Sequence, residues 1–329
     1  MNVHVTMADT ETRANFFPEF LRNRLESLGS VTWNTSTENY SESELRDRIA
    51  GVDVLVTGWG SPQVTESVLS EADELELVVH TGGSVATIAS EALYEAEIPV
   101  VSANDVMADH TAEHTLAGLL SMRRAIPALN ASMHRGEWSQ NGDIVRTLHD
   151  ATIGLVGLGT IGRKLLDHLA PFDPTVAVYD PYVDETALAD VPFAELTDLD
   201  TALDSEVVSI HAARTPETVG MLGADRLARI PDGGILVNTA RAEIVDEDAL
   251  FAELRSGRLS AVLDVYHEEP LPADHELRDL DNVLLTPHVG GSQIRPPLTK
   301  AVIGDIERFA AGKPLEHEIA RGQWETMTR

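Results

Sequence analysis

Residues 151–162 read ATIGLVGLGTIG, and this stretch decides how the surrounding chain folds. Its first half is a short apolar run typical of a buried strand, and its second half carries three glycines in the pattern G-x-G-x-x-G. Gly157 permits a tight turn, Gly159 lets the backbone approach a pyrophosphate, and Gly162 lets the next helix pack closely on the strand. The stretch therefore predicts the strand–turn–helix unit of a dinucleotide-binding domain.

An acidic residue follows the next predicted strand and bears on the choice of cofactor. The strand reads TVAVY over residues 175–179, and Asp180 follows it, 18 residues after the last glycine of the pattern. A carboxylate here can hold the ribose hydroxyls of NAD and repels the 2′-phosphate of NADP, for which residues 181–184 offer no Arg or Lys. The helix N-terminus, at Thr160 and Ile161, is predicted to meet the pyrophosphate. NAD is therefore the expected cofactor.

The composition of the 329 residues is that of a globular chain long enough for two domains. No apolar run reaches the roughly 18 residues of a transmembrane helix. The first five residues start a strand pattern and lack the basic and apolar segments of a signal peptide, so we expect a cytoplasmic protein. The absence of cysteine excludes disulfides and thiolate chemistry.

The charge balance is strongly acidic. The chain carries 54 acidic against 24 basic residues, a net charge of −30, and its only lysines are Lys164, Lys300 and Lys313. Salt relieves the self-repulsion of such a surface, because the Debye length is about 3 Å at 1 M. We therefore expect a halophilic protein adapted to a salty cytoplasm, with an ordinary acidic protein as the alternative. Nucleic acid and anionic membranes are unfavourable partners.

Short apolar runs alternate with helical patterns along the whole chain. Predicted strands lie at 3–6, 53–57, 75–79, 98–101, 151–156, 175–179, 207–210, 235–238, 261–264 and 283–285. A long helical pattern at 111–133 is expected to break at Pro127, and a last helix is expected near 296–311. This alternation predicts an α/β fold with parallel sheets covered by helices.

The carboxyl ends of parallel strands lie at one edge of a sheet, where ligands bind. Residues directly after the predicted strands are therefore candidate contacts to cofactor or substrate. They are His211, Thr239, Ala240, Arg241, Asp264 to Glu269, and Pro287 with His288.

From about residue 53 to residue 314, these motifs resemble the D-isomer-specific 2-hydroxyacid dehydrogenase family. The glycine fingerprint, an Arg, a Glu-Pro pair and a Pro-His pair follow one another at spacings close to those of the family. The resemblance implies that Arg241, Glu269 and His288 are catalytic, and that a small 2-oxo acid and its D-2-hydroxy acid are interconverted with NAD. It also implies a homodimer.

The chemistry of the three residues agrees with this assignment. Reduction of a 2-oxo acid needs a hydride, a proton and a group that binds a carboxylate. The planar guanidinium of Arg241 suits the carboxylate and carbonyl oxygens. Histidine titrates near neutral pH, so His288 can donate a proton to the forming alkoxide, and Glu269 can orient the ring and favour its protonated form. Each residue alone also has a structural explanation, as a helix-capping ion pair, a solvated acid or a core histidine.

Further cofactor contacts follow from the resemblance. His211 and Thr215 match the cofactor-contacting segment after the fourth strand, although its usual proline is missing here. Thr239, Ala240, Asp264 and Gly290 complete the predicted cofactor set. Ala242 replaces the glycine that usually follows the arginine.

The predicted substrate contacts depart more from the family pattern. Gly83, Ser84 and Val85 stand where the family has a Gly-x-Gly-x-Asp loop whose N–H groups grip the substrate carboxylate. No arginine occurs near Thr57 or His80 in the sequence, which disfavours a phosphorylated substrate. Trp59 is predicted either to line an apolar substrate pocket or to be a packing residue at a strand end.

The resemblance places two Rossmann-like parallel-sheet domains on either side of a cleft. The substrate domain is discontinuous, residues 1–102 plus 293–329, and the NAD domain is 103–292. The family's formate branch has Gln at the position of Glu269, so the acid favours 2-hydroxy acid chemistry.

Three other interpretations compete with this one. The chain could be an NAD-sensing protein of the family's corepressor type, or a dehydrogenase of an unrelated anion such as phosphite. His110, Glu113 and His114 also match the zinc pattern H-x-x-E-H, but they lack its context, and we expect no metal site.

Overall fold

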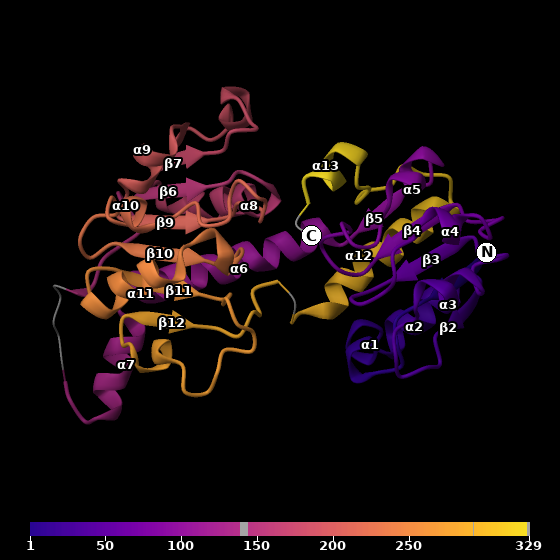
Figure 1. Cartoon of the computed structure of the whole chain (residues 1–329), viewed down its shortest axis with the longest axis horizontal. Coiled ribbons are helices and arrows are strands. Elements are labelled where there is room, and N and C mark those ends of the chain that lie inside the picture. The colour runs from indigo at the N-terminus through magenta and orange to yellow at the C-terminus, as the bar shows by residue number, and fades with distance from the viewer. Residues whose placement is uncertain (139–143, 292, 328–329) are drawn as a thin grey trace. The chain divides into compact units, whose positions relative to one another are not determined.

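A computed structural model of the chain describes residues 1–138, 144–291 and 293–327 (Figure 1). The chain divides into two compact units: unit 1 is Met1–Ala108 with Ser292–Arg329, and unit 2 is Asp109–Gly291. Each unit has its own parallel sheet, with five strands in unit 1 and seven in unit 2. The predicted fold class, parallel-sheet α/β units of Rossmann-like type, is confirmed.

Unit 1 is a five-stranded sheet covered by helices on both faces. Its strands, in the sheet order β2-β1-β3-β4-β5, are Ser30–Trp33, Asn2–Val5, Val54–Thr57, Leu77–His80 and Val100–Ser102. Its helices are α1 (Glu11–Phe16), α2 (Glu19–Glu26), α3 (Glu42–Arg46), α4 (Glu66–Leu69), α5 (Glu91–Glu95), α12 (Arg295–Ala310) and α13 (Arg321–Glu325). Alternate residues of β3 enter different cores: Val54 and Val56 pack with α1, α2 and α12, whereas Leu55 packs with α3 to α5.

Unit 2 contains the glycine fingerprint. Its strands, in the sheet order β12-β11-β10-β9-β6-β7-β8, are Val283–Leu285, Ser260–Leu263, Ile235–Asn238, Val207–Ile210, Thr152–Val156, Thr175–Tyr179 and Ala194–Leu196. Its helices are α7 (Ile126–His134), α8 (Thr160–Leu169), α9 (Leu199–Leu203), α10 (Ala224–Leu227), α11 (Glu247–Ser256) and the short η2 (Ala170–Phe172), η3 (Glu185–Leu188), η4 (Ala242–Ile244) and η5 (Glu276–Asp279). The strand order reverses at β6, and ligands of such sheets bind at that reversal.

Helix α6 (Asn104–Arg123) runs from unit 1 into unit 2 and differs from its prediction. It starts earlier than the predicted helix, and the break before α7 lies at Ala125, which has a left-handed φ of 51°. Pro127 lies in the first turn of α7, where a missing N–H costs nothing, so it starts a helix instead of ending one. Among the described residues, no helix is long and apolar enough to cross a membrane.

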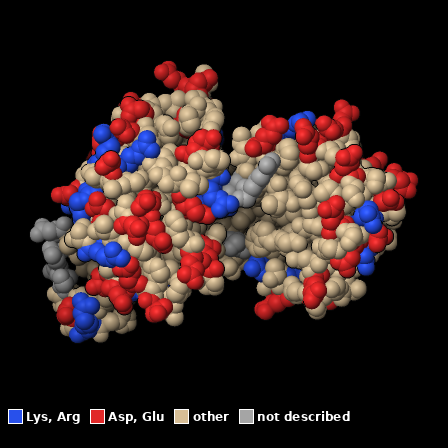
Figure 2. Space-filling view, in the orientation of Figure 1, with Lys and Arg blue, Asp and Glu red and all other residues tan. Residues whose placement is uncertain are grey.

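Acidic side chains are spread over both units rather than gathered in one patch. Figure 2 shows them scattered across the visible face, with fewer Lys and Arg side chains between them. Many of the arginines pair with an acid, as Arg24 does with Glu307 at 2.7 Å and Arg229 with Asp204 at 2.7 Å. The remaining acids therefore produce a broadly negative surface.

Candidate active site

The glycine fingerprint forms the turn between β6 and α8. Gly157 has a φ of 99°, and a Cβ there would lie 2.6 Å from the backbone nitrogen of Ala212. A Cβ at Gly162 would lie 2.5 Å from the carbonyl oxygen of Gly157, so neither position has room for a side chain. Gly159 caps α8, and a Cβ there would meet no described residue within 4 Å. The open space at Gly159 is a cradle that fits a cofactor phosphate at the helix N-terminus.

Asp180 lies beside this turn, directly after β7. Its Oδ2 accepts a hydrogen bond from the backbone N–H of Leu158 at 2.7 Å, and its Oδ1 accepts one from Tyr182 at 2.9 Å. An ionised carboxylate has about four lone-pair sites, so these two bonds hold the group in place and leave acceptors for ribose hydroxyls. Thr160 and Ile161 start α8 next to it. This geometry suits an NAD ribose and pyrophosphate.

His211 follows β9 and is buried. Its Nε2 lies 2.8 Å from the Ser209 hydroxyl, and its buried Nδ1 has no hydrogen-bond partner among the described residues. Burial lowers the pKa of His211 to about 4, so the ring is neutral at physiological pH. A buried ring nitrogen without a partner at the ligand edge is what a bound cofactor group would satisfy.

The other predicted cofactor residues lie in hydrogen-bonded turns at the same edge. The Thr215 N–H donates to the hydroxyl of Thr218 at 2.8 Å, which closes a turn although the family's proline is missing. The Thr239 hydroxyl lies 2.9 Å from that of Thr115 on α6, and the Ala240 N–H donates to the Asn238 side chain at 3.1 Å.

The structure brings Glu269 and His288 together. They follow neighbouring strands, β11 and β12, and Glu269 Oε2 lies 2.7 Å from His288 Nδ1. The other carboxylate oxygen accepts the backbone N–H of Tyr266 at 3.0 Å, which fixes the acid. The two side chains are 37% and 47% exposed and line a cavity of about 590 Å³, so they are accessible to a small ligand.

His288 adopts a strained backbone conformation, with a φ of 51°. Such strain in a non-glycine residue costs about 1–3 kcal/mol and persists only where neighbours enforce it. The carboxylate of Asp264 supplies that enforcement, because it accepts hydrogen bonds from the Thr286 hydroxyl (2.6 Å) and the N–H groups of Val289 and Gly290 (2.9 Å each). Asp264 is 1% exposed, and it anchors both sides of the loop that carries His288.

Arg241 follows β10 and precedes η4. Asn238 donates to its carbonyl oxygen at 2.9 Å, and the Arg241 Nη1 donates to the carbonyl of Ala240 at 2.6 Å. The pKa of Arg241 is lowered, mainly by burial and also by the positive charge of Arg214. The acids Glu243 and Glu269 partly oppose this shift. Arginine stays charged under such shifts. The three predicted catalytic residues therefore follow adjacent strands of one sheet, β10, β11 and β12.

Several residues of this site were missed by sequence reasoning. Thr286 and His114 are the main ones: His114 Nε2 lies 3.0 Å from the Thr286 hydroxyl and 3.7 Å from Asp264 Oδ1. The helix carrying the zinc-like pattern thus directs its last histidine at the Asp264 loop. Within the described residues no group of three His, Cys, Asp or Glu side chains is placed to hold a metal. Thr286 could have been found, because it directly follows β12.

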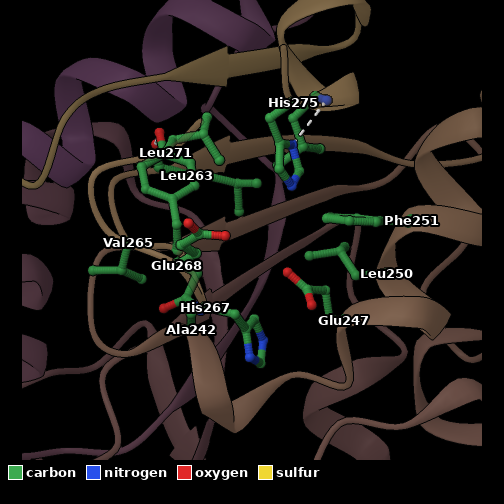
Figure 3. Close-up of a pocket in the computed structure, with 13 residues that line it drawn as sticks. Ala242, Glu247, Leu250, Phe251, Leu263, Val265, His267, Glu268, Leu271 and His275 are labelled. Carbon is green, nitrogen blue, oxygen red and sulfur yellow. Dashed lines mark hydrogen bonds between the residues drawn. The ribbon is translucent and has the colours of Figure 1, made fainter. Parts of the chain in front are cut away.

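The loop after β11 lines two different hollows. Figure 3 shows His267 and Glu268 facing a pocket with an apolar wall that includes Leu250 and Phe251. Glu269 instead lines the cavity of His288. Adjacent acids of this loop thus line different hollows, and it is Glu269 that contacts His288.

Apart from Arg241, the predicted substrate residues lie in unit 1. A Cβ at Gly83 would lie 2.8 Å from the sulfur of Met107, so a side chain there would require the methionine to shift. Ser84 Oγ accepts the N–H of Ala86 at 3.3 Å, and the side chain of Val85 is buried in the unit 1 core. Val85 can therefore contact a ligand only through its main chain. Trp59 follows β3 and is 38% exposed.

Comparison with known proteins gives consistent matches. The model of the family described as "D-isomer specific 2-hydroxyacid dehydrogenase, NAD binding domain" matches residues 116–290. The chain is 34% identical to D-3-phosphoglycerate dehydrogenase of Methanocaldococcus jannaschii over 299 residues, which cover 90% of this chain and 56% of that protein. It is 33% identical to hydroxypyruvate reductase of Thermotoga maritima over 262 residues, 78% of this chain and 84% of that protein.

The solved structure of a phosphoglycerate oxidoreductase from Rhizobium etli superposes with a TM-score of 0.82 at 25% identity, over 98% of this chain and 99% of that one. The chain spans about half the length of the curated phosphoglycerate dehydrogenases that it matches.

Proposed function

Because the chain belongs to the D-isomer specific 2-hydroxyacid dehydrogenase family and carries its NAD-binding domain, we propose that it interconverts a small 2-oxo acid and its D-2-hydroxy acid. The observation that carries the proposal is the Glu269–His288 contact of 2.7 Å at the ligand edge of the sheet that holds the glycine turn. A homodimer and a cytoplasmic location remain predictions.

His288 is the proposed general acid and base. During reduction it donates a proton to the oxygen that forms from the carbonyl, and during oxidation it removes that proton. Because Glu269 contacts Nδ1, Nε2 is the ring nitrogen proposed to exchange the proton with the substrate. Glu269 acts as a positioning residue, because its carboxylate holds the imidazole in this orientation.

Arg241 is the proposed binding group for the substrate carboxylate and carbonyl. Its guanidinium offers two parallel N–H donors to one carboxylate, which fixes the direction in which the carbonyl points. The charge of Glu269, which contacts the proposed proton donor, acts on Arg241, and this supports a shared site. The main-chain N–H groups of Gly83, Ser84 and Val85 in unit 1 are proposed as further donors to the substrate.

Gly157, Gly159 and Asp180 would hold the pyrophosphate and adenosine ribose, and His211 would face the cofactor with its unsatisfied Nδ1. NAD(H), when bound, supplies or accepts the hydride at C2 of the acid. The proton transfer in the proposal is made by His288, a residue of the chain itself.

The test is NADH absorbance with glyoxylate, hydroxypyruvate, pyruvate and phenylpyruvate in molar KCl. His288→Ala is expected to lower kcat by about 10²–10⁴-fold, the usual contribution of a general acid. His149→Asn, an exposed histidine of the same unit, is the control and should keep full activity. Folded protein that binds NADH but reduces none of these acids would contradict the proposal and favour a sensor or a different anion.

A further inference from the structure

Arg295, the first residue of α12, lies over two aromatic side chains of unit 1. Its guanidinium carbon is 5.4 Å from the centre of the Phe16 ring and 5.8 Å from that of Trp59. The two rings meet edge to face at 5.2 Å. Phe16 is fully buried and Trp59 is partly exposed, so the guanidinium covers the border between the core and the surface. Cation–π contacts of this kind attract a guanidinium to the ring and favour one position of the side chain.

This arrangement lies at the edge of the unit 1 sheet where ligands of parallel sheets bind. Trp59 follows β3 by two residues, and Gly82 follows β4 by two. A Cβ at Gly82 would lie 2.7 Å from the indole nitrogen of Trp59 and 2.5 Å from Nε2 of His80. The missing side chain at Gly82 lets the indole approach the loop. Trp59 therefore contacts Arg295 on one side and lies next to the segment that is proposed to bind substrate.

The sequence contains no arginine near Thr57 or His80, and that absence disfavours a phosphorylated substrate. The fold reverses this argument. It brings Arg295, more than 200 residues away in the chain, onto the tryptophan that follows β3. The unit therefore has a cation at this edge, supplied by α12 instead of by the strand-end loops.

We propose that Arg295 is a specificity-determining residue that binds an anionic group at the end of the substrate remote from the 2-oxo acid. The guanidinium packs on both aromatic rings, and the spacing of the N–H donors of an arginine matches both carboxylates and phosphates. The ordering of the side chain by the rings lowers the entropy lost when an anion binds. This inference rests on the proposed function, because it takes unit 1 to contribute the substrate loop.

The first test compares Arg295→Met with the wild type on three 2-oxo acids at one KCl concentration. Oxaloacetate carries a distal carboxylate, 3-phosphohydroxypyruvate a distal phosphate, and pyruvate neither. For the anion-bearing acid that the wild type prefers, kcat/KM is expected to fall about 10- to 100-fold, mainly through KM, while the value for pyruvate stays within about twofold. Whichever of the two acids shows the loss identifies the anion as carboxylate or phosphate.

Two further variants separate binding from packing. Arg295→Lys keeps the charge without the planar fork and should recover part of the loss. Arg22→Met removes another arginine that covers a ring, at 4.6 Å from Trp33, and should leave all three substrates unchanged. An equal loss for all three acids in Arg295→Met, or no loss for any, would overturn the inference.

A binding measurement distinguishes failure of this inference from failure of the proposed function. If the wild type reduces none of the acids, calorimetric titration with malonate and with inorganic phosphate still tests Arg295. Heat of binding to the wild type that is lost in Arg295→Met would support the anion site without the reaction. No binding of either anion to the wild type would overturn it.

Discussion

Replacing Asp264 by Asn is expected to loosen the loop that carries His288. The carboxylate accepts three hydrogen bonds, from the Thr286 hydroxyl and from the N–H groups of Val289 and Gly290. An amide offers one acceptor oxygen where the carboxylate offers two. If that oxygen keeps the bonds made by Oδ1, the new NH₂ group faces the Gly290 N–H, 2.9 Å from the present Oδ2. One buried donor is then left without an acceptor and opposes a second donor.

The expected magnitude follows from these groups. A hydrogen bond to a charged acceptor contributes about 1.5–3 kcal/mol, and a buried unsatisfied N–H costs about 1–3 kcal/mol. We expect Asp264→Asn to lower the free energy of unfolding of unit 2 by about 2–4 kcal/mol. The loop also enforces the left-handed backbone of His288, and a displacement of the order of 1 Å at a catalytic group can cost about 10² in rate. The kcat should therefore fall by about 10- to 100-fold.

The assay is urea unfolding at a fixed KCl concentration, with kcat and the NADH dissociation constant measured on the same samples. Asp246→Asn is the matched control, since Asp246 also accepts a backbone N–H but is exposed, and Asn caps helices equally well. Thr286→Val removes one donor to Asp264 and should lower the free energy of unfolding by about 1–3 kcal/mol. The effects of Thr286→Val and Asp264→Asn should not add in the double variant, because both act on the same hydrogen bond. Wild-type stability in Asp264→Asn, or a rate loss wholly explained by weaker NADH binding, would refute the reasoning.

Three further outcomes are expected. Glu269→Gln keeps the size of the side chain but not its charge, and should lower kcat about 10- to 100-fold with unchanged NADH affinity; equal kcat would show that the acid does not act on His288. Burial lowers the pKa of both His80 and His211 to about 4, whereas histidine in the unfolded chain has a pKa of about 6.5. Between about pH 6.5 and about pH 4 these histidines are therefore neutral in the folded protein, and the unfolded state binds more protons. Stability should be full above pH 6.5 and should fall towards pH 4 by about 3 kcal/mol per histidine, a slope that His211→Gln reduces; a flat urea midpoint over this range would contradict it. Removal of KCl should lower the melting temperature and the activity, because acids outnumber basic residues 54 to 24, whereas an unchanged melting temperature in dilute buffer would argue against salt adaptation.

The parts of the fold that sequence predicts are those whose pattern is set by burial. Strands β3, β4, β9 and β10 are buried along their whole length and read as continuous apolar runs. Strand β2 was missed because it lies at the sheet edge, where exposed polar residues such as Ser30 and Thr32 interrupt the apolar pattern. Strand β8 is a three-residue edge strand and leaves almost no pattern to detect.

The same distinction applies to the candidate site. Arg241, Glu269 and His288 each follow a strand, and the parallel sheet places strand ends at one edge, so chain order alone brings them into one region. His114 and Arg295 lie on helices, and their place depends on how a helix face packs against the sheet. No local pattern encodes that packing, and the histidine of the zinc-like motif is instead 3.0 Å from Thr286.

The net charge of −30 bears on how an anionic substrate could reach these residues. At low ionic strength the acidic surface repels a 2-oxo acid over a Debye length of about 30 Å, whereas at 1 M salt the range shrinks to about 3 Å. Contacts at hydrogen-bond distance, such as those proposed for Arg241 and Arg295, are screened much less. Salt should therefore remove the repulsion on approach while preserving the recognition, so kcat/KM for an anionic acid should rise with KCl even in a range where the melting temperature no longer changes.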